Sequence, residues 1–147
     1  MDTNILFQFK DFGLDAVLAF SAIGSAFGTG VAGMAAVGAW KKAYAQNKAA
    51  SFMVIAFVGA PLTQTIYGMI VMNKMAEVSL KTGGVGVLCG LAIGASAYMQ
   101  GKAGAVAADA LGETGKGFGN YIVVLGIIET VALFVMAFVM GLLGRLA

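Results

Sequence analysis

Glu129 is an acidic residue in an otherwise apolar segment. It lies near the middle of the last apolar run of the chain, which covers residues 119–144. If this run spans a membrane, a charged side chain at that depth costs at least ~2.5–3.5 kcal/mol. Burial disfavours the charged form of an acid unless a cation or hydrogen-bond donors lie beside it. We therefore interpret Glu129 as a reversible cation site. The alternative is a neutral acid that stabilises helix packing.

Four polar side chains lie at a similar depth in two other apolar runs. The run 51–73 carries Thr63, Gln64 and Tyr67, and Gln100 lies in the middle of the run 85–111. Thr63 and Tyr67 are four residues apart and share one face of a helix, while Gln64 lies one step around it. Tyr67 is not needed as an ion ligand, but its hydroxyl can donate a hydrogen bond to Glu129. Each of these groups must find a partner at mid-depth, because it loses its water there.

Pro61 adds backbone oxygens to this set. A proline lacks an N–H group and displaces the carbonyl four residues earlier, so we expect free carbonyl oxygens in the turn 57–60. A plain kink is the alternative. The oxygen atoms of the candidate ion site then come from one backbone carbonyl and four side chains: Thr63, Gln64, Gln100 and Glu129. This set favours sodium, because a proton needs only the acid.

The elements that position these residues are transmembrane helices. The 147 residues are 60% hydrophobic and 11% charged, with a mean hydropathy of +0.91, whereas soluble domains are about 45–50% apolar and about 25% charged. A span needs roughly 20 apolar residues. The apolar runs 12–39, 51–73, 85–111 and 119–144 therefore predict an all-α membrane protein of four transmembrane helices, with no separate soluble domain.

The composition excludes several classes of function. The chain has no histidine, and Cys89 is its single cysteine, so one chain cannot assemble the usual zinc, haem or disulfide sites. The net charge of +2 comes without the basic stripe that nucleic-acid binding requires. No phosphate-binding loop of the GxxxxGK[ST] kind occurs. We expect no enzyme activity from the isolated chain, no organic cofactor and no nucleic-acid partner.

The sequence repeats itself as two helical hairpins. Ser25-Ala26-Phe27 matches Ser96-Ala97-Tyr98 at an offset of 71 residues, and the segment 29–33 matches 100–104 at the same offset. We predict a first hairpin over 1–78, with helices at 12–39 and 51–73, and a second over 79–147, with helices at 85–111 and 119–144. Gln64 then corresponds to Glu129 at an offset of about 65 residues.

The first and third helices carry glycines at a spacing of four residues: Gly24 and Gly28, then Gly86, Gly90 and Gly94. This spacing lets transmembrane helices approach closely. One interpretation is packing within a single four-helix bundle. The other places both helices on the crowded inner surface of a ring of identical copies. Helices two and four then form a bulkier outer layer with Phe52, Phe57, Ile70, Phe134, Phe138 and Met140.

Charge determines the orientation only weakly. Five lysines lie on the side of the hairpin loops: Lys41, Lys42, Lys48, Lys102 and Lys116. Four basic residues lie on the other side: Lys10, Lys74, Lys81 and Arg145. Positive-inside counting leans toward cytoplasmic hairpin loops, with both termini on the opposite side.

Taken together, these residues resemble the duplicated four-helix proteolipid of V-type ATPases, the c or K subunit of the rotor ring, over essentially the whole chain. The matching segments are 61–68, 100–102 and 128–130 together with the glycine-rich helices. In the sodium-binding bacterial members, the ion is held by residues matching Thr63, Gln64, Gln100 and Glu129 and by a carbonyl matching Ala60, while a tyrosine matching Tyr67 bonds to the glutamate. Ala60 and Leu62 depart from the expected residue types, but neither removes an oxygen ligand.

The resemblance implies a mechanism and partners. Identical copies form a homo-oligomeric ring in a bacterial cell membrane, surrounded by lipids. The ring turns against a stator subunit of the a or I type, whose arginine competes for Glu129, and a central-stalk subunit of the d or C type couples it to ATP hydrolysis or synthesis. Na⁺ is the expected transported ion. The alternatives are a proton-carrying rotor and, in a different class, a passive channel or structural membrane oligomer.

Overall fold

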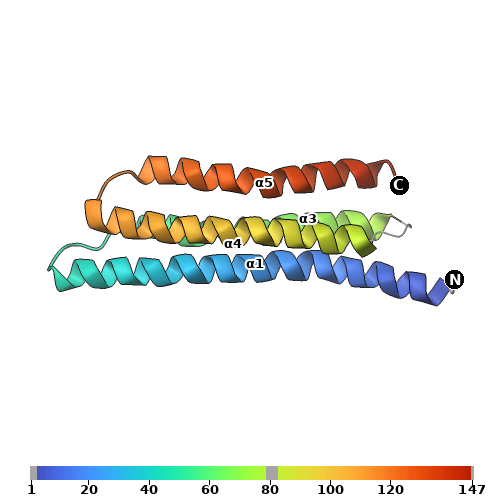
Figure 1. The fold of residues 1–147 in the computed structure, drawn as a ribbon, viewed down its shortest axis with the longest axis horizontal. Helices are drawn as coiled ribbons and strands as arrows, with labels where there is room; N and C mark the ends of the chain where they lie inside the picture. The colour runs from blue at the N-terminus through green and yellow to red at the C-terminus, as the bar shows by residue number, and fades with distance from the viewer. Residues whose placement is uncertain (1–2, 79–82, 147) are drawn as a thin grey trace.

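All regular elements in the described part of the chain are helices. The computed structural model describes residues 3–78 and 83–146. The elements are α1 (Thr3–Ala45), α2 (Val54–Gly59), the short 3-10 helix η1 (Ala60–Leu62), α3 (Thr63–Glu77), α4 (Gly83–Thr114) and α5 (Phe118–Gly144). They run side by side along one axis (Figure 1).

Four helical segments are long and apolar enough to cross a membrane: Asp11–Ala45, Val54–Glu77, Gly83–Thr114 and Phe118–Gly144. This confirms the predicted all-α architecture of four transmembrane helices. The boundary predicted between the two hairpins falls next to residues 79–82, which lie outside the described residues.

Several predicted helix ends are wrong. The first helix begins at Thr3 rather than at residue 12, and polar residues extend the first and second spans at their other ends rather than end them. The first helix continues through Trp40-Lys41-Lys42 to Ala45, since lysine is a good helix former and both lysines are exposed. The Trp40 indole N–H donates a hydrogen bond to the Ser51 carbonyl at 2.8 Å, which ties the loop back to the helix. The second span likewise continues past residue 73 to Glu77.

Pro61 divides the second span into two α-helical parts. The turn Ala60–Leu62 adopts a 3-10 helix between α2 and α3, as expected where a proline removes a helical hydrogen bond. Pro61 is buried against α1, where its Cβ would lie 2.9 Å from a Cβ built on Gly28. The break therefore lies in the core of the bundle, and α3 begins at Thr63, directly after it.

A seam of glycines joins α1 to α4. A Cβ added to Gly24 would lie 2.1 Å from the carbonyl oxygen of Gly94, and one added to Gly86 would lie 2.1 Å from that of Gly13. Gly90 faces the backbone of Ala16 and Val17 in the same way. All five glycines of the predicted packing set thus contact the other helix within one chain, as the bundle interpretation expected. Their role in packing between copies stays a prediction.

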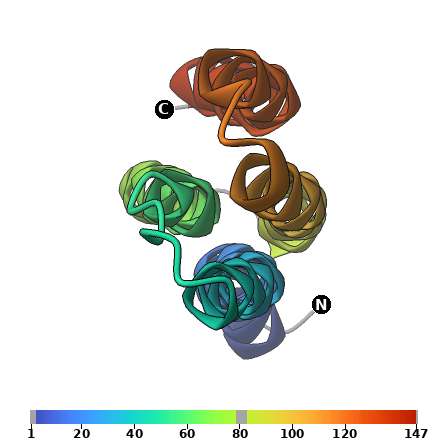
Figure 2. The same ribbon diagram turned by 90° about the vertical axis from the view of Figure 1, so that its left-hand side faces the viewer.

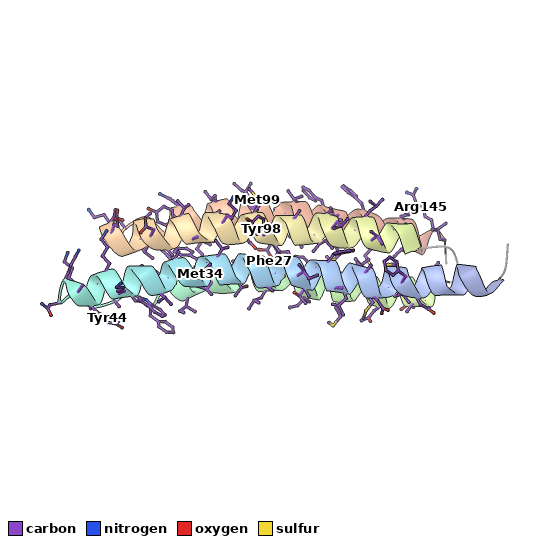
Figure 3. The ribbon with its side chains drawn as sticks, turned by 60° about the horizontal axis from the view of Figure 1, so that its bottom comes forward. Phe27, Met34, Tyr44, Tyr98, Met99 and Arg145 are labelled. Carbon is purple, nitrogen blue, oxygen red and sulfur yellow. The ribbon has the colours of Figure 1, made fainter. Side chains whose placement is uncertain are left out.

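The helices differ greatly in how much of their surface the chain covers. Seen end-on, α1, α3 and α4 lie at the corners of a triangle, and α5 lies on the side of α4 that faces away from α1 (Figure 2). The most apolar window of α4 is 50% buried, but that of α5 is only 11% buried. Large apolar side chains such as Phe27, Met34 and Met99 point outward (Figure 3). Phe57, predicted in an outer layer, is instead fully buried, because α2 turns it toward α4.

Candidate ion-binding site

Glu129 lies on α5, half-buried, where α3 and α4 pack against it. Its Oε1 accepts two hydrogen bonds from α3, one from Thr63 Oγ1 at 2.6 Å and one from the Tyr67 hydroxyl at 2.6 Å. Thr63 is the first residue of α3 after the proline turn, and Tyr67 lies one turn later on the same face. The helix that begins directly after the Pro61 turn therefore supplies both donors to this oxygen.

Two buried glutamines connect the acid to the middle of the bundle. Gln100 Nε2 lies 3.3 Å from Glu129 Oε2 and 3.0 Å from the Leu125 carbonyl oxygen, and it donates to both. Gln64 Nε2 donates to Gln100 Oε1 at 2.8 Å. Both glutamine side chains are 0% exposed. A continuous line of polar groups thus runs from α3 through α4 to α5.

The Ala60 carbonyl also belongs to this cluster. It lies 3.0 Å from Thr63 Oγ1, which is also 3.1 Å from Gln64 Oε1. A threonine hydroxyl carries one proton, so it donates to one of its neighbours at a time, and its distance to Glu129 is the shortest. All the residues singled out by the sequence for ion binding are therefore within one hydrogen-bonded cluster.

The amide of Gln100 faces Glu129 with its nitrogen rather than its oxygen. An amide N–H is the natural partner of a carboxylate oxygen. If Gln100 is to ligate a cation through Oε1, its amide must turn over, which breaks its bonds to the Leu125 carbonyl and to Gln64. Ion binding through this residue thus involves an exchange of hydrogen-bond partners in addition to the formation of a metal contact.

One polar contact of the site was missed by the sequence interpretation. The hydroxyl of Ser96 donates to the carbonyl oxygen of Ile128 at 3.0 Å, directly before Glu129 in the chain. Ser96 lies one helical turn before Gln100 on α4, but its position alone does not show whether its hydroxyl bonds to its own helix or to a neighbouring one. In the described part of the chain, the buried hydroxyls of Ser25 and Thr29 have no hydrogen-bond partner.

The described residues hold no group of three or more His, Cys, Asp or Glu side chains that could bind a metal ion. Glu129 is therefore surrounded by hydroxyl and amide groups rather than by further acids. A single carboxylate with neutral oxygen donors suits a monovalent cation, whose one charge it neutralises.

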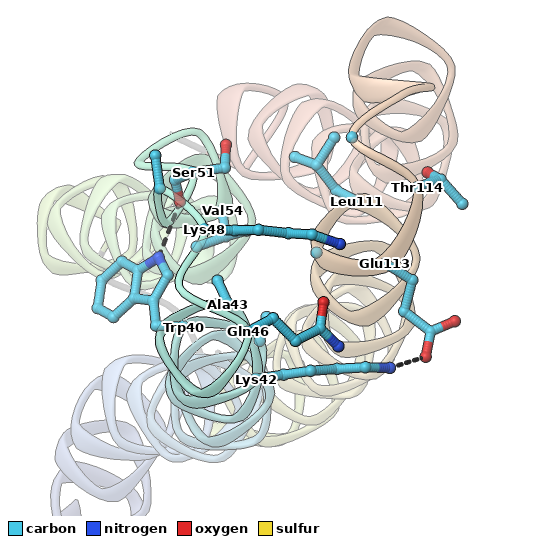
Figure 4. A pocket seen from close by; sticks show the side chains of 14 residues that line it. Trp40, Lys42, Ala43, Gln46, Lys48, Ser51, Val54, Leu111, Glu113 and Thr114 are labelled. Atoms are coloured by element: carbon cyan, nitrogen blue, oxygen red, sulfur yellow. Dashed lines mark hydrogen bonds and ion pairs between the residues drawn. The ribbon is translucent and has the colours of Figure 1, made fainter.

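A second polar region lies at the end of the bundle that carries the hairpin loops. A cavity of about 340 Å³ is lined there by Trp40, Gln46 and Lys48 among others (Figure 4). Lys42 forms an ion pair with Glu113 at its rim. These two residues are 71 residues apart in the sequence, the same offset as the repeat, so matching positions of the two hairpins meet here. None of the residues around Glu129 lines this cavity.

The comparison with known proteins concerns the hairpin that carries the acid. Residues 83–143 match the family model described as the C subunit of ATP synthase. No curated protein matches the chain significantly. The matched segment contains α4 and almost all of α5, and with them Ser96, Gln100 and Glu129. The second hairpin of this integral membrane protein is therefore similar to the C subunit of ATP synthase, a family whose members form ion-translocating rotor rings and are not catalytic themselves.

Proposed function

We propose that this chain is a rotor-ring subunit of a V-type ATPase and that it carries Na⁺ across the membrane by reversible binding at Glu129. The observation that carries the proposal is the convergence of Thr63, Gln64, Gln100 and the Ala60 carbonyl near one intramembrane carboxylate. Thr63, Gln64 Oε1 and the Ala60 carbonyl offer neutral oxygen atoms near a single negative charge, and Gln100 adds another when its amide turns over.

A cycle of binding and release follows from the charge of the site. One Na⁺ neutralises one carboxylate, so the occupied site can pass lipid without the large penalty of an uncompensated charge. At the stator, an arginine of an a- or I-type subunit competes for Glu129 and displaces the ion. Tyr67 donates to Glu129 Oε1 at 2.6 Å and holds the carboxylate in place while the ion exchanges.

The proposed assembly is a ring of identical copies in a bacterial cell membrane, with the hairpin loops on the cytoplasmic side and a d- or C-type central-stalk subunit bound to the ring. The exposed apolar surface of α5 supports this arrangement, because a helix window that is 11% buried within its own chain leaves most of its surface for neighbouring copies and lipid.

A proton-carrying rotor is the second candidate, and one observation favours it. Gln100 directs its amide nitrogen, not its oxygen, toward Glu129. The Gln100 oxygen is bonded to Gln64 instead, so it is not directed to a sodium ion at Glu129, whereas a proton needs only the acid.

The test is labelling of Glu129 with a carbodiimide in the purified oligomer while sodium is titrated at several pH values. The reagent attacks the protonated acid, so a bound ion protects it. Protection by Na⁺ at neutral pH, but not by choline at the same ionic strength, is the expected result. Labelling that ignores Na⁺ and falls only with rising pH would replace sodium by protons. If Glu129 is not labelled at all, the rotor function is wrong.

A further inference from the structure

Side-chain hydroxyls in these helices have two ways to satisfy their hydrogen bonds. Some bond within their own helix: Ser21 donates to the Val17 carbonyl at 2.7 Å, and Thr130 donates to the Ile127 carbonyl at 2.6 Å. Such bonds hold no neighbouring helix. Ser96 differs, because its hydroxyl crosses from α4 to the Ile128 carbonyl of α5, and its residue is 6% exposed.

Two side chains of α4 thus bind the α5 backbone on both sides of a single helical turn. Gln100 donates to the Leu125 carbonyl at 3.0 Å, and Ser96 donates to the Ile128 carbonyl at 3.0 Å. Ile128 directly precedes Glu129, and Leu125 is the residue whose carbonyl accepts the helical bond of the Glu129 amide. These contacts fix the rotation and the height of α5 where it presents the acid.

The two contacts behave differently when an ion binds. The amide of Gln100 must turn over to offer its oxygen to a cation, and it then loses the Leu125 carbonyl. Ser96 takes no part in that exchange, so its bond to α5 persists. Because α5 is the least buried of the long helices, it has few other contacts with which to keep its place.

We infer that Ser96 is a positioning residue for the ion site: its hydroxyl holds the α5 backbone beside Glu129 while Gln100 exchanges hydrogen-bond partners. The inference rests on the proposed function, since it assumes that an ion exchanges at Glu129. It predicts that loss of the Ser96 hydroxyl weakens ion binding more than it weakens the fold, because the cost of ordering α5 falls on the ion-bound state.

The first hairpin supplies a matched control. Ser25 corresponds to Ser96 at the repeat offset, and it is similarly buried at 2% exposure. Its hydroxyl has no hydrogen-bond partner among the described residues. Ser25→Ala and Ser96→Ala therefore remove the same atom from equally buried positions, but only the second removes a bond between helices.

The experiment measures the Na⁺ concentration that gives half-protection of Glu129 from the carbodiimide in the intact oligomer. We expect Ser96→Ala to raise it about 3-fold, the effect of an average side-chain hydrogen bond between membrane helices. Ser25→Ala should leave it unchanged. Ser96→Thr keeps a hydroxyl and should restore the wild-type value. Ser96→Cys keeps the size of the side chain but donates weakly, so it gives an intermediate rise and carries the test if Ser96→Ala does not assemble.

The outcomes separate this inference from the proposed function. Wild-type protection with no shift in Ser96→Ala, or an equal shift in Ser25→Ala, overturns the inference and leaves the sodium rotor intact. If Na⁺ does not protect the wild type, the sodium proposal fails. The inference is then judged by the pH at which labelling is half-maximal, where a shift in Ser96→Ala that Ser25→Ala lacks supports it and equal values overturn it.

Discussion

The corresponding polar residues of the two hairpins differ in how deeply they are buried. Gln64, in the second span, is 0% exposed and bonded into the middle of the bundle. Its counterpart Glu129, in the fourth span, is half-buried at the edge of the bundle. A neutral amide can be enclosed completely if its hydrogen bonds are satisfied, whereas an acid that exchanges an ion must stay accessible to that ion. The difference teaches that the first hairpin places its neutral amide in the core of the bundle, whereas the second hairpin presents its acid at the edge.

The helices that precede these residues show the same difference. Gln100 on α4 bonds to both the backbone and the side chain of α5. Thr29, which takes its place on α1, has a buried hydroxyl without a partner in the described part of the chain. The second hairpin is thus held together by polar contacts at mid-depth, and the first is held to α4 by close glycine packing.

The largest effect is expected when the acid of the second hairpin is replaced by the amide that the first hairpin carries at the corresponding position. Glu129→Gln gives the second hairpin the residue type of the first, and it removes the only charge in the cluster. We expect coupled ion transport and carbodiimide labelling to be lost while the oligomer still assembles, measured by ion uptake into vesicles and by native gel. Glu77→Gln is the control, because Glu77 is an exposed acid that pairs with Lys74. Retained transport by Glu129→Gln would contradict the proposed site.

The next largest effect is expected at the glycine seam. In Gly94→Leu the new side chain meets the Phe20 carbonyl oxygen 2.4 Å from its Cβ, and overpacking of this kind costs about 1–3 kcal/mol or more. We expect loss of the compact chain, measured by thermal denaturation in detergent, and of the oligomer on a native gel. Gly30→Leu should spare the fold, because a Cβ there meets nothing within 4 Å of its own chain. A normal melting temperature for Gly94→Leu would argue against a tight α1–α4 seam.

A smaller effect is expected from a single donor to the carboxylate. Tyr67→Phe removes a hydrogen bond to a charged group, which contributes about 1.5–3 kcal/mol. The Na⁺ concentration for half-protection of Glu129 should therefore rise about 10- to 100-fold. Tyr121→Phe is the matched control, because the Tyr121 ring packs against Phe57 in the other core cluster. Equal values for the two variants would show that Tyr67 does not support the ion site.

The smallest effect is expected where corresponding positions of the hairpins meet in water. Lys42 and Glu113 form an ion pair with both side chains about half exposed, and exposed pairs of this kind add little to stability. Lys42→Ala should leave both the melting temperature in detergent and ion transport unchanged. A clear loss of transport without a change in melting temperature would give this end of the bundle a function that its exposure does not predict.

The main features of the site could be predicted from the sequence because they depend on depth. Glu129, Gln100 and Thr63 stand out as polar residues in apolar runs, and at mid-depth such groups must find one another. The fold class follows from the number and length of those runs. The repeat offset also indicated which positions correspond.

Other features could not be read from the sequence, for physical reasons. The four-residue spacing of Gly24 and Gly28, and of Gly90 and Gly94, indicates that helices approach closely, but it does not say whether the facing helix belongs to the same chain. The orientation of an amide depends on its neighbours, so the sequence could not indicate that Gln100 turns its nitrogen to Glu129. A serine in a helix bonds to its own backbone as readily as to another helix, so Ser96 could not be distinguished from Ser21.

The seam between α1 and α4 has a consequence for biosynthesis. The second span separates α1 from α4 in the sequence. During synthesis α1 is therefore made and inserted before the helix that it packs against exists. About 70 residues lie between the end of α1 at Ala45 and the end of α4 at Thr114, and at about 5–20 residues per second their synthesis takes roughly 4–14 s. During that interval the glycine face of α1 has no permanent partner. The nascent chain is therefore most vulnerable to misassembly and proteolysis before its third span is inserted.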